Sequence, residues 1–89
     1  MNYCVYILIN IDKKPFFSYV GYTNNLKNRL ILHNTSKGAK FTRGRLWKLI
    51  YKKKYRTKQE ALKDEYKLKK NKKKRAKIKI KYLIKNNLI

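Results

Sequence analysis

Residues 2–10 of this 89-residue chain carry apolar side chains at both odd and even positions. If the segment is a strand, successive side chains point to opposite sides of the sheet. One side then carries Tyr3, Val5, Ile7 and Ile9, and the other side carries Cys4, Tyr6 and Leu8. Because both sides are apolar, the segment is predicted to be a central strand that is covered on both faces.

Two further strands are predicted by the same kind of pattern. A turn around Pro15 precedes residues 18–22, which are expected to return as the antiparallel partner of a hairpin. Gly21 in this second strand has no β-carbon, so a ligand or another part of the chain can approach it closely. Residues 47–55 alternate from Trp47 onwards and predict a third strand, whose lysine-rich end is typical of a protected edge.

Residues 24–34 have the spacing of an amphipathic helix, with Thr23 or Asn24 as the expected N-cap. The predicted inward stripe consists of Leu26, Leu30 and His33. Arg29 precedes His33 by four residues, so the two side chains share a face of the helix. Each residue also has a non-functional explanation. Arg29 can simply extend to solvent, and His33 can simply interact with the helix dipole.

Residues 57–70 form the clearest predicted helix, because Thr57 and Glu60 have the spacing of a capping box. Its predicted inward face consists of Ala61, Leu62, Glu65 and Leu68. A carboxylate on such a face costs several kcal/mol unless it is paired or binds a metal ion. Glu65 is therefore expected either to bind a metal or to form a buried ion pair with Arg29.

The C-terminal residues 76–89 fit two patterns. Isoleucine and tyrosine alternate with lysine as in a strand, yet a helical stripe is also present. The length of the segment and the absence of a turn signal favour the helix. The stripe consists of Ala76, Ile80, Leu83, Ile84 and Leu88.

Charge dominates the composition, since 26 Lys and Arg face four acids and give a net charge of +22. A polyanion is the expected partner, with nucleic acid first and an anionic membrane second. The basic residues are spread over every segment, which favours nucleic acid, although part of the charge is also explained as solvated surface.

The single cysteine, Cys4, excludes an internal disulfide and is expected to be buried. No signal peptide is recognisable, so a cytoplasmic protein is predicted.

The segment 35–45 reads as a loop with two glycines, several cations and one aromatic ring, Phe41. Such a loop offers backbone donors, positive charge and a surface on which a base can stack. The alternative is an ordinary solvated loop. The residues predicted to bind nucleic acid here are Lys37, Lys40, Thr42, Arg43 and Arg45.

Several short motifs, taken in order, resemble the small single-domain branch of the GIY-YIG nuclease family. They are Val5-Tyr6, Tyr19-Val20-Gly21, Arg29-Leu30, His33-Asn34, the run from Lys37 to Gly44, and Glu60-Ala61-Leu62 with Glu65 and Lys69. The resemblance extends from about Tyr3 to Leu83. One departure is that Cys4-Val5-Tyr6 stands where the family has Gly-Ile-Tyr, which is expected to narrow the site.

The resemblance implies an α+β domain, in which helices flank a small three-stranded antiparallel sheet, and metal-dependent cleavage of DNA. It implies that Tyr6 and Tyr19 are the two signature tyrosines and that Arg29 is the catalytic arginine. Glu65 corresponds to the metal-binding glutamate, and His33 to a histidine frequent in this branch. Whether the DNA is branched or nicked is left open.

The chemistry of these residues agrees with that assignment. Tyr6 is expected to orient or deprotonate the attacking water, helped by a positive environment that favours its phenolate. Arg29 can donate a forked pair of hydrogen bonds to phosphate oxygens, and Glu65 suffices to hold Mg²⁺ or Mn²⁺. The alternatives are a non-catalytic nucleic-acid-binding module on the same fold and a basic protein bound to structured RNA. A membrane role ranks last.

Overall fold

The computed structural model describes residues 2–89. Three strands, β1 (Tyr3–Asn10), β2 (Ser18–Thr23) and β3 (Trp47–Tyr55), form one sheet. The strand order is β2-β1-β3, and both neighbours run antiparallel to β1. The prediction that the first strand is central is therefore confirmed.

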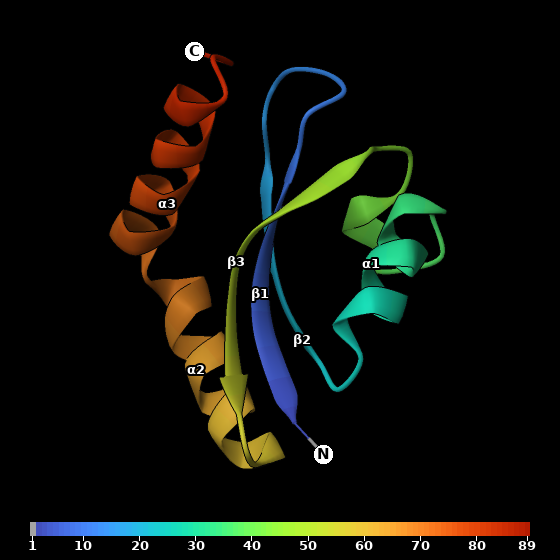
Figure 1. Cartoon of the computed structure of the whole chain (residues 1–89), viewed down its shortest axis with the longest axis vertical. Coiled ribbons are helices and arrows are strands. Elements are labelled where there is room, and N and C mark those ends of the chain that lie inside the picture. The colour runs from blue at the N-terminus through green and yellow to red at the C-terminus, as the bar shows by residue number, and fades with distance from the viewer. Residues whose placement is uncertain (1) are drawn as a thin grey trace.

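Four helical segments complete the chain: α1 (Leu26–Asn34), the short 3-10 helix η1 (Lys40–Thr42), α2 (Lys58–Lys70) and α3 (Lys72–Lys85). In Figure 1, α1 lies on one side of the sheet, and α2 and α3 lie on the other. The predicted α+β architecture, with helices flanking a three-stranded antiparallel sheet, is confirmed. Among the residues described, no helix is long and apolar enough to cross a membrane.

The core has two parts because the side chains of β1 alternate between the two faces. On the α2 side, Val5 and Ile7 are fully buried. On the α1 side, Tyr6, Leu8 and Trp47 form the second cluster. The α2-side cluster also contains Val20, Ala61 and Leu68. Tyr6 thus belongs to the face of the sheet that α1 covers.

The helix ends follow their capping residues. Asn25, one residue after the predicted cap, accepts a hydrogen bond from the Asn28 amide at 3.1 Å and starts α1. Thr57 accepts from the Glu60 amide at 3.2 Å, and its hydroxyl donates to the Glu60 carboxylate at 3.0 Å. The predicted capping pair at the start of α2 is therefore present.

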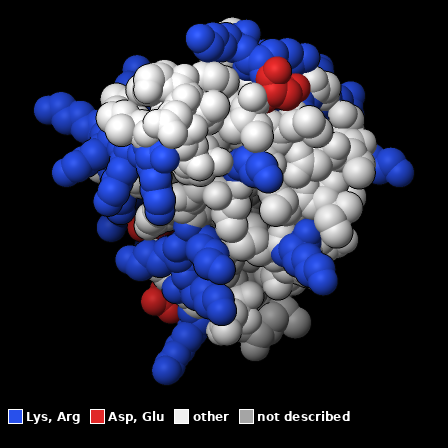
Figure 2. All heavy atoms as spheres, turned by 45° about the horizontal axis from the view of Figure 1, so that its top comes forward, with Lys and Arg blue, Asp and Glu red and all other residues white. Residues whose placement is uncertain are grey.

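The predicted inward stripes of the last two helices need correction. Ile80 and Ile84 are 49% and 59% exposed, and Leu83 is the buried residue of α3. On α2, Leu62 is also exposed, whereas Ala61 and Leu68 are buried. Each helix buries only a narrow stripe, because one sheet face of this small domain cannot cover two helices fully. Figure 2 shows basic side chains standing out from the surface, most densely on the side of α2 and α3.

Candidate active site

The centre of the site is Tyr6, whose ring crosses over the neighbouring strand β2 at Gly21. The two residues are directly opposite in the β1–β2 register. A β-carbon at residue 21 would lie 2.5 Å from the Tyr6 hydroxyl oxygen and 2.6 Å from Cζ. The close approach that the sequence predicts at Gly21 is therefore made by Tyr6, and a side chain there would displace the tyrosine.

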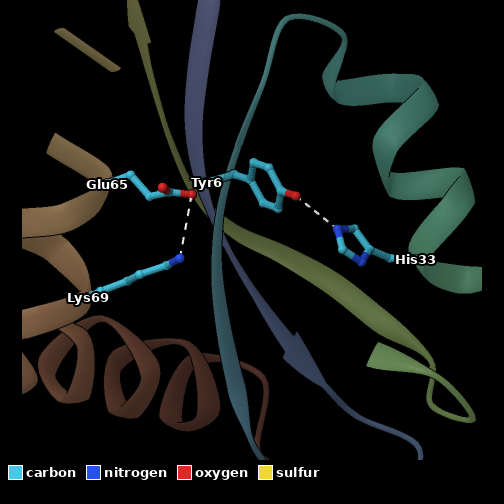
Figure 3. A network of polar contacts seen from close by, with 4 residues as sticks. All are labelled: Tyr6, His33, Glu65 and Lys69. Carbon is cyan, nitrogen blue, oxygen red and sulfur yellow. Dashed lines mark hydrogen bonds and ion pairs between the residues drawn. The ribbon is translucent and has the colours of Figure 1, made fainter. Parts of the chain in front are cut away.

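A chain of hydrogen bonds holds the Tyr6 hydroxyl. The Tyr6 oxygen lies 2.8 Å from Nε2 of His33, which projects from α1 (Figure 3). His33 is fully buried, and its Nδ1 lies 2.9 Å from the hydroxyl of Thr42. The Thr42 hydroxyl in turn donates to the carbonyl of Ala39 at 2.8 Å.

This chain determines the tautomer of His33. Because Thr42 donates its only hydroxyl proton to Ala39, it accepts from His33, so Nδ1 carries the imidazole proton. Nε2 is then the acceptor and the Tyr6 hydroxyl is the donor. Gly38 makes room for this arrangement, since a β-carbon there would lie 2.6 Å from Nδ1 of His33.

Thr42 requires a correction, because the sequence predicts it to contact nucleic acid. It is fully buried and bonded to His33. Nothing in the sequence pattern distinguishes it from its exposed neighbours, since its burial depends on how the loop folds over α1.

The sequence pattern also did not reveal the role of Asn34. Its side chain accepts a hydrogen bond from the Trp47 amide at 2.6 Å and donates one to the Trp47 carbonyl at 3.2 Å. It thereby ties the end of α1 to the start of β3.

The second signature tyrosine, Tyr19, lies beside Tyr6 on the same face of the sheet. The ring centroids of Tyr6 and Tyr19 are 6.4 Å apart, and those of Tyr19 and His33 are 5.1 Å apart. Both tyrosines are thus brought together with His33, as the sequence predicts. Cys4, the departure from the family motif, is buried and does not line the cavity beside Arg29.

Burial governs the titration of these groups. It raises the pKa of Tyr6 to about 12, although the neighbouring Arg29 guanidinium lowers it. Burial also raises the pKa of Tyr19 and lowers that of His33, in the latter case with help from Arg29. Arg29 therefore acts in the expected direction, towards the Tyr6 phenolate, but burial has the larger effect and the net pKa is raised. At neutral pH, Tyr6 is a phenol that donates to a neutral imidazole.

Arg29 reaches the site from α1. It borders a cavity of about 360 Å³ whose lining includes Tyr22, Asn24 and Lys58. Among the residues described, the buried Nε of Arg29 makes no hydrogen bond. A buried donor without a protein partner is costly, so this guanidinium is suited to binding an anion in the cavity.

Glu65 approaches from α2, on the opposite side of the strands from the Tyr6 ring (Figure 3). Its side chain is 16% exposed, and its carboxylate lies 3.8 Å from the Lys69 ammonium. In the described part of the chain, its ion pair is with Lys69 and not with Arg29, so that alternative is wrong. Its negative charge contributes to raising the pKa of both Tyr6 and Tyr19.

Glu65 fits a hard divalent cation better than zinc. Within residues 2–89 there is no group of three or more His, Cys, Asp or Glu that could surround a metal ion. A single partly exposed carboxylate suits Mg²⁺ or Mn²⁺, because Mg²⁺ usually keeps several waters and uses one or two protein carboxylates with substrate phosphates. Lys69 is 54% exposed and can move away from the carboxylate.

The remaining loop residues lie apart from this centre. Lys37, Lys40 and Arg43 are exposed, in keeping with their predicted contact with nucleic acid. Arg45 is half-buried, with its guanidinium carbon 4.7 Å from the centre of the Phe17 ring. Among the described residues, no hydrogen bond or ion pair joins these cations to Tyr6 or His33.

The three-stranded antiparallel sheet with its flanking helices, and the two tyrosines, arginine, histidine and glutamate set around β1 and β2, are the features expected of the GIY-YIG class of proteins. The sequence matches the family described as the GIY-YIG catalytic domain over residues 2–79, and the chain belongs to this family. Its relatives are UPF0213 proteins, small single-domain members of the family. The family assignment implies nuclease chemistry, a nucleic-acid substrate and, in general, divalent metal ions.

Three comparisons illustrate the likeness. UPF0213 protein OB0043 of Oceanobacillus iheyensis is 50% identical over 66 residues, which are 73% of each chain. A UPF0213 protein of Bacillus licheniformis is 55% identical over 53 residues, 58% of this chain and 55% of that relative. The solution NMR structure of UPF0213 protein BH0048 from Bacillus halodurans has a TM-score of 0.51 and 37% identity, covering 91% of this chain and 86% of that one.

The titration of His33 tests the hydrogen-bond chain directly, because His33 is the only histidine. We expect its imidazole pKa below 6.5 in the folded protein, and a proton on Nδ1. Between the lowered folded pKa and about pH 6.5, the unfolded chain binds more protons on average than the folded protein, so the free energy of unfolding should decrease as the pH falls through this range. Nitrogen-15 NMR of the imidazole measures both the pKa and the tautomer.

The matched variants are Thr42→Val and Thr42→Ser. Valine removes the acceptor for Nδ1–H and should mix the two tautomers, whereas serine keeps the hydroxyl and should preserve the NMR signature. A His33 pKa at or above 6.5, or an Nε2–H tautomer in the unaltered protein, would contradict the proposed direction of the Tyr6–His33 hydrogen bond.

Proposed function

We propose that this protein is a divalent-metal-dependent endonuclease that hydrolyses DNA phosphodiester bonds. The observation that carries the proposal is the hydrogen bond from the Tyr6 hydroxyl to a neutral, buried His33. A buried phenol with a pKa of about 12 is a poor base by itself. A phenol that can pass its own proton to an imidazole can nevertheless act as a general base.

The attack on phosphorus follows from this pair. Tyr6 orients a water molecule, and its oxygen takes the water proton as its own hydroxyl proton moves to Nε2 of His33. The water oxygen then forms the new bond to phosphorus, and the leaving oxygen departs with the electron pair of the broken P–O bond. Because His33 must be neutral to accept the proton, cleavage should fall when the pH drops below its lowered pKa.

The other residues act on the phosphate. Arg29 can donate its guanidinium hydrogens to non-bridging oxygens, where negative charge develops. Tyr19, whose ring centroid lies 6.4 Å from that of Tyr6, would orient the phosphate or the water. Glu65 would hold the divalent ion, which, when bound, supplies a Lewis acid for the phosphate oxygens.

Replacing Arg29 by lysine separates charge from geometry. Arg29→Lys keeps the cation but loses the planar fork, so cleavage should fall about 10²- to 10³-fold, as for the loss of one transition-state donor. Affinity for uncleaved DNA should change little, because the net charge of +22 is retained. Single-turnover cleavage and a gel-shift titration measure the two effects. The control is Arg56→Lys at an exposed position, and equal cleavage by both variants would remove Arg29 from the mechanism.

The first experiment is a cleavage assay on supercoiled plasmid and a panel of branched DNAs with Mg²⁺ or Mn²⁺. Nicking that a chelator abolishes is the expected result. Binding without cutting under every metal condition would favour a non-catalytic DNA-binding module on the same fold. Stronger binding to structured RNA than to DNA, in direct competition, would favour an RNA-associated protein.

A further inference from the structure

A second groove lies along the outer edge of β2, next to the site already described. Its volume is about 210 Å³, below the roughly 300–1,000 Å³ of pockets that enclose a drug-sized ligand. The groove is therefore shallow and suits a single flat group. Its lining residues are Ser18, Tyr19, Val20, Phe41, Lys69 and Arg75. Tyr19 belongs to both the groove and the proposed catalytic set, so whatever occupies the groove lies beside the reacting phosphate.

Phe41 forms the aromatic wall of this groove. It is 54% exposed, so part of its ring is accessible to a ligand. Three other rings hold it in place: it stacks on Tyr19 at 6.2 Å with an interplanar angle of 20°, and its centroid lies 5.8 Å from Phe17 and 6.1 Å from Trp47. A ring that is exposed and already immobilised loses little entropy when a base stacks on it.

Arg75 and Lys69 form the opposite, cationic wall. Nε of Arg75 donates to the Leu68 carbonyl at 3.1 Å, at the corner between α2 and α3, which holds the guanidinium in one orientation. Lys69 is 54% exposed and reaches towards Glu65. The groove thus places a flat apolar ring across from fixed positive charge. A nucleotide has the matching chemistry, with a base that stacks and a phosphate that binds cations.

We infer that the groove between Phe41 and Arg75 binds one unpaired nucleotide of DNA adjacent to the cleaved phosphate. The inference rests on the proposed function, and it narrows the substrate to DNA with a single-stranded segment at the cut. In an intact duplex the bases are stacked on one another and paired, so none offers a free face to Phe41. A single strand, flap or gap presents such a face.

The test measures binding in the presence of a chelator, so that it does not depend on cleavage. Fluorescence anisotropy compares a short single-stranded DNA oligonucleotide, its blunt duplex and an RNA oligonucleotide of the same sequence. Phe41→Leu keeps the apolar contact with Tyr19 and Trp47 but removes the flat ring. It should weaken single-strand binding about tenfold, within the range for loss of one base–aromatic stack, and change duplex binding less than about twofold. Phe41→Trp should retain binding, and Tyr66→Ala, on the exposed outer face of α2, is the control.

The contribution of Arg75 to the cationic wall is tested separately, through the salt dependence of binding. Arg75→Gln should reduce the slope of log affinity against log salt by about 0.7 on the single strand, the value for one lost phosphate contact. Equal effects of Phe41→Leu on single strand and duplex, or no effect on either, would overturn the inference. A preference for the RNA would overturn its assignment to DNA. If Phe41 proves necessary for single-strand binding but no metal supports cleavage, the groove still binds an unpaired nucleotide, whereas the nuclease proposal and the position next to a cleaved phosphate both fail.

Discussion

Tyr6→Phe should abolish most cleavage while leaving the fold and DNA binding intact. The change removes one hydroxyl group from a fully packed ring, so the contacts with Gly21 and His33 are otherwise preserved. In the proposed mechanism, that hydroxyl links the attacking water to Nε2 of His33. Loss of a positioned general base costs typically about 10²- to 10⁴-fold, and we expect a decrease in that range. Single-turnover cleavage of plasmid with saturating metal measures it.

Tyr66→Phe is the matched control, since Tyr66 is 59% exposed and lies away from β2 on α2. It should cleave like the unaltered protein. A melting curve and a gel shift for Tyr6→Phe establish that the variant folds and binds. If a folded Tyr6→Phe protein cleaves within about threefold of the unaltered protein, well short of the loss expected for a general base, the relay through His33 is wrong.

Glu65→Gln should decrease cleavage by a similar factor. The amide has nearly the same shape as the carboxylate, but it lacks the charge that would hold Mg²⁺ or Mn²⁺. Metal-assisted charge stabilisation is worth several kcal/mol, so we expect cleavage to fall about 10³-fold. DNA binding should be unchanged or slightly tighter, because one of only four acids is lost from a strongly basic chain. Cleavage as a function of metal concentration separates weaker metal binding from slower chemistry.

Glu60→Gln is the control for this change. Glu60 lies on the same helix and carries the same carboxylate group, but its side chain takes part in the cap of the first turn. Glutamine can take the same place in such a cap. Both variants gain one unit of net charge, so any difference between them reports the position and not the charge. Equal metal dependence in Glu65→Gln and Glu60→Gln would remove Glu65 as the metal ligand.

The sequence was sufficient for the order of the elements and for much of the site. The two-sided apolar pattern of residues 2–10 predicts a central strand, and β1 lies between β2 and β3. Thr57 and Glu60 locate the start of α2. The motif residues Tyr6, Tyr19, Arg29 and His33 were recognised by their order along the chain, and the fold brings them together at β2. These predictions succeed because strand and helix periodicities are local properties.

The sequence-based predictions were wrong where the environment of a side chain depends on residues that are far away along the chain. Thr42 was predicted at the surface, and the inward stripe of α3 was predicted at Ile80 and Ile84. The positive charge of the chain was also expected to favour the Tyr6 phenolate, without knowing that the ring is buried and its pKa raised. Residue type and spacing do not reveal which side of a helix another element covers, nor how far a ring lies from water.

The sequence by itself therefore determined which elements form, which family the chain belongs to, and which side chains are available for chemistry. Only the tertiary structure decided how those side chains are connected. It placed Tyr6 within hydrogen-bonding distance of a histidine 27 residues away, and it gave that histidine a threonine that assigns its proton to Nδ1. It also set Glu65 on the opposite side of the strands from the Tyr6 ring, with Lys69 as its partner. Hydrogen bonds and desolvation act over a few ångströms in space, and those distances exist only after the sheet and helices have packed.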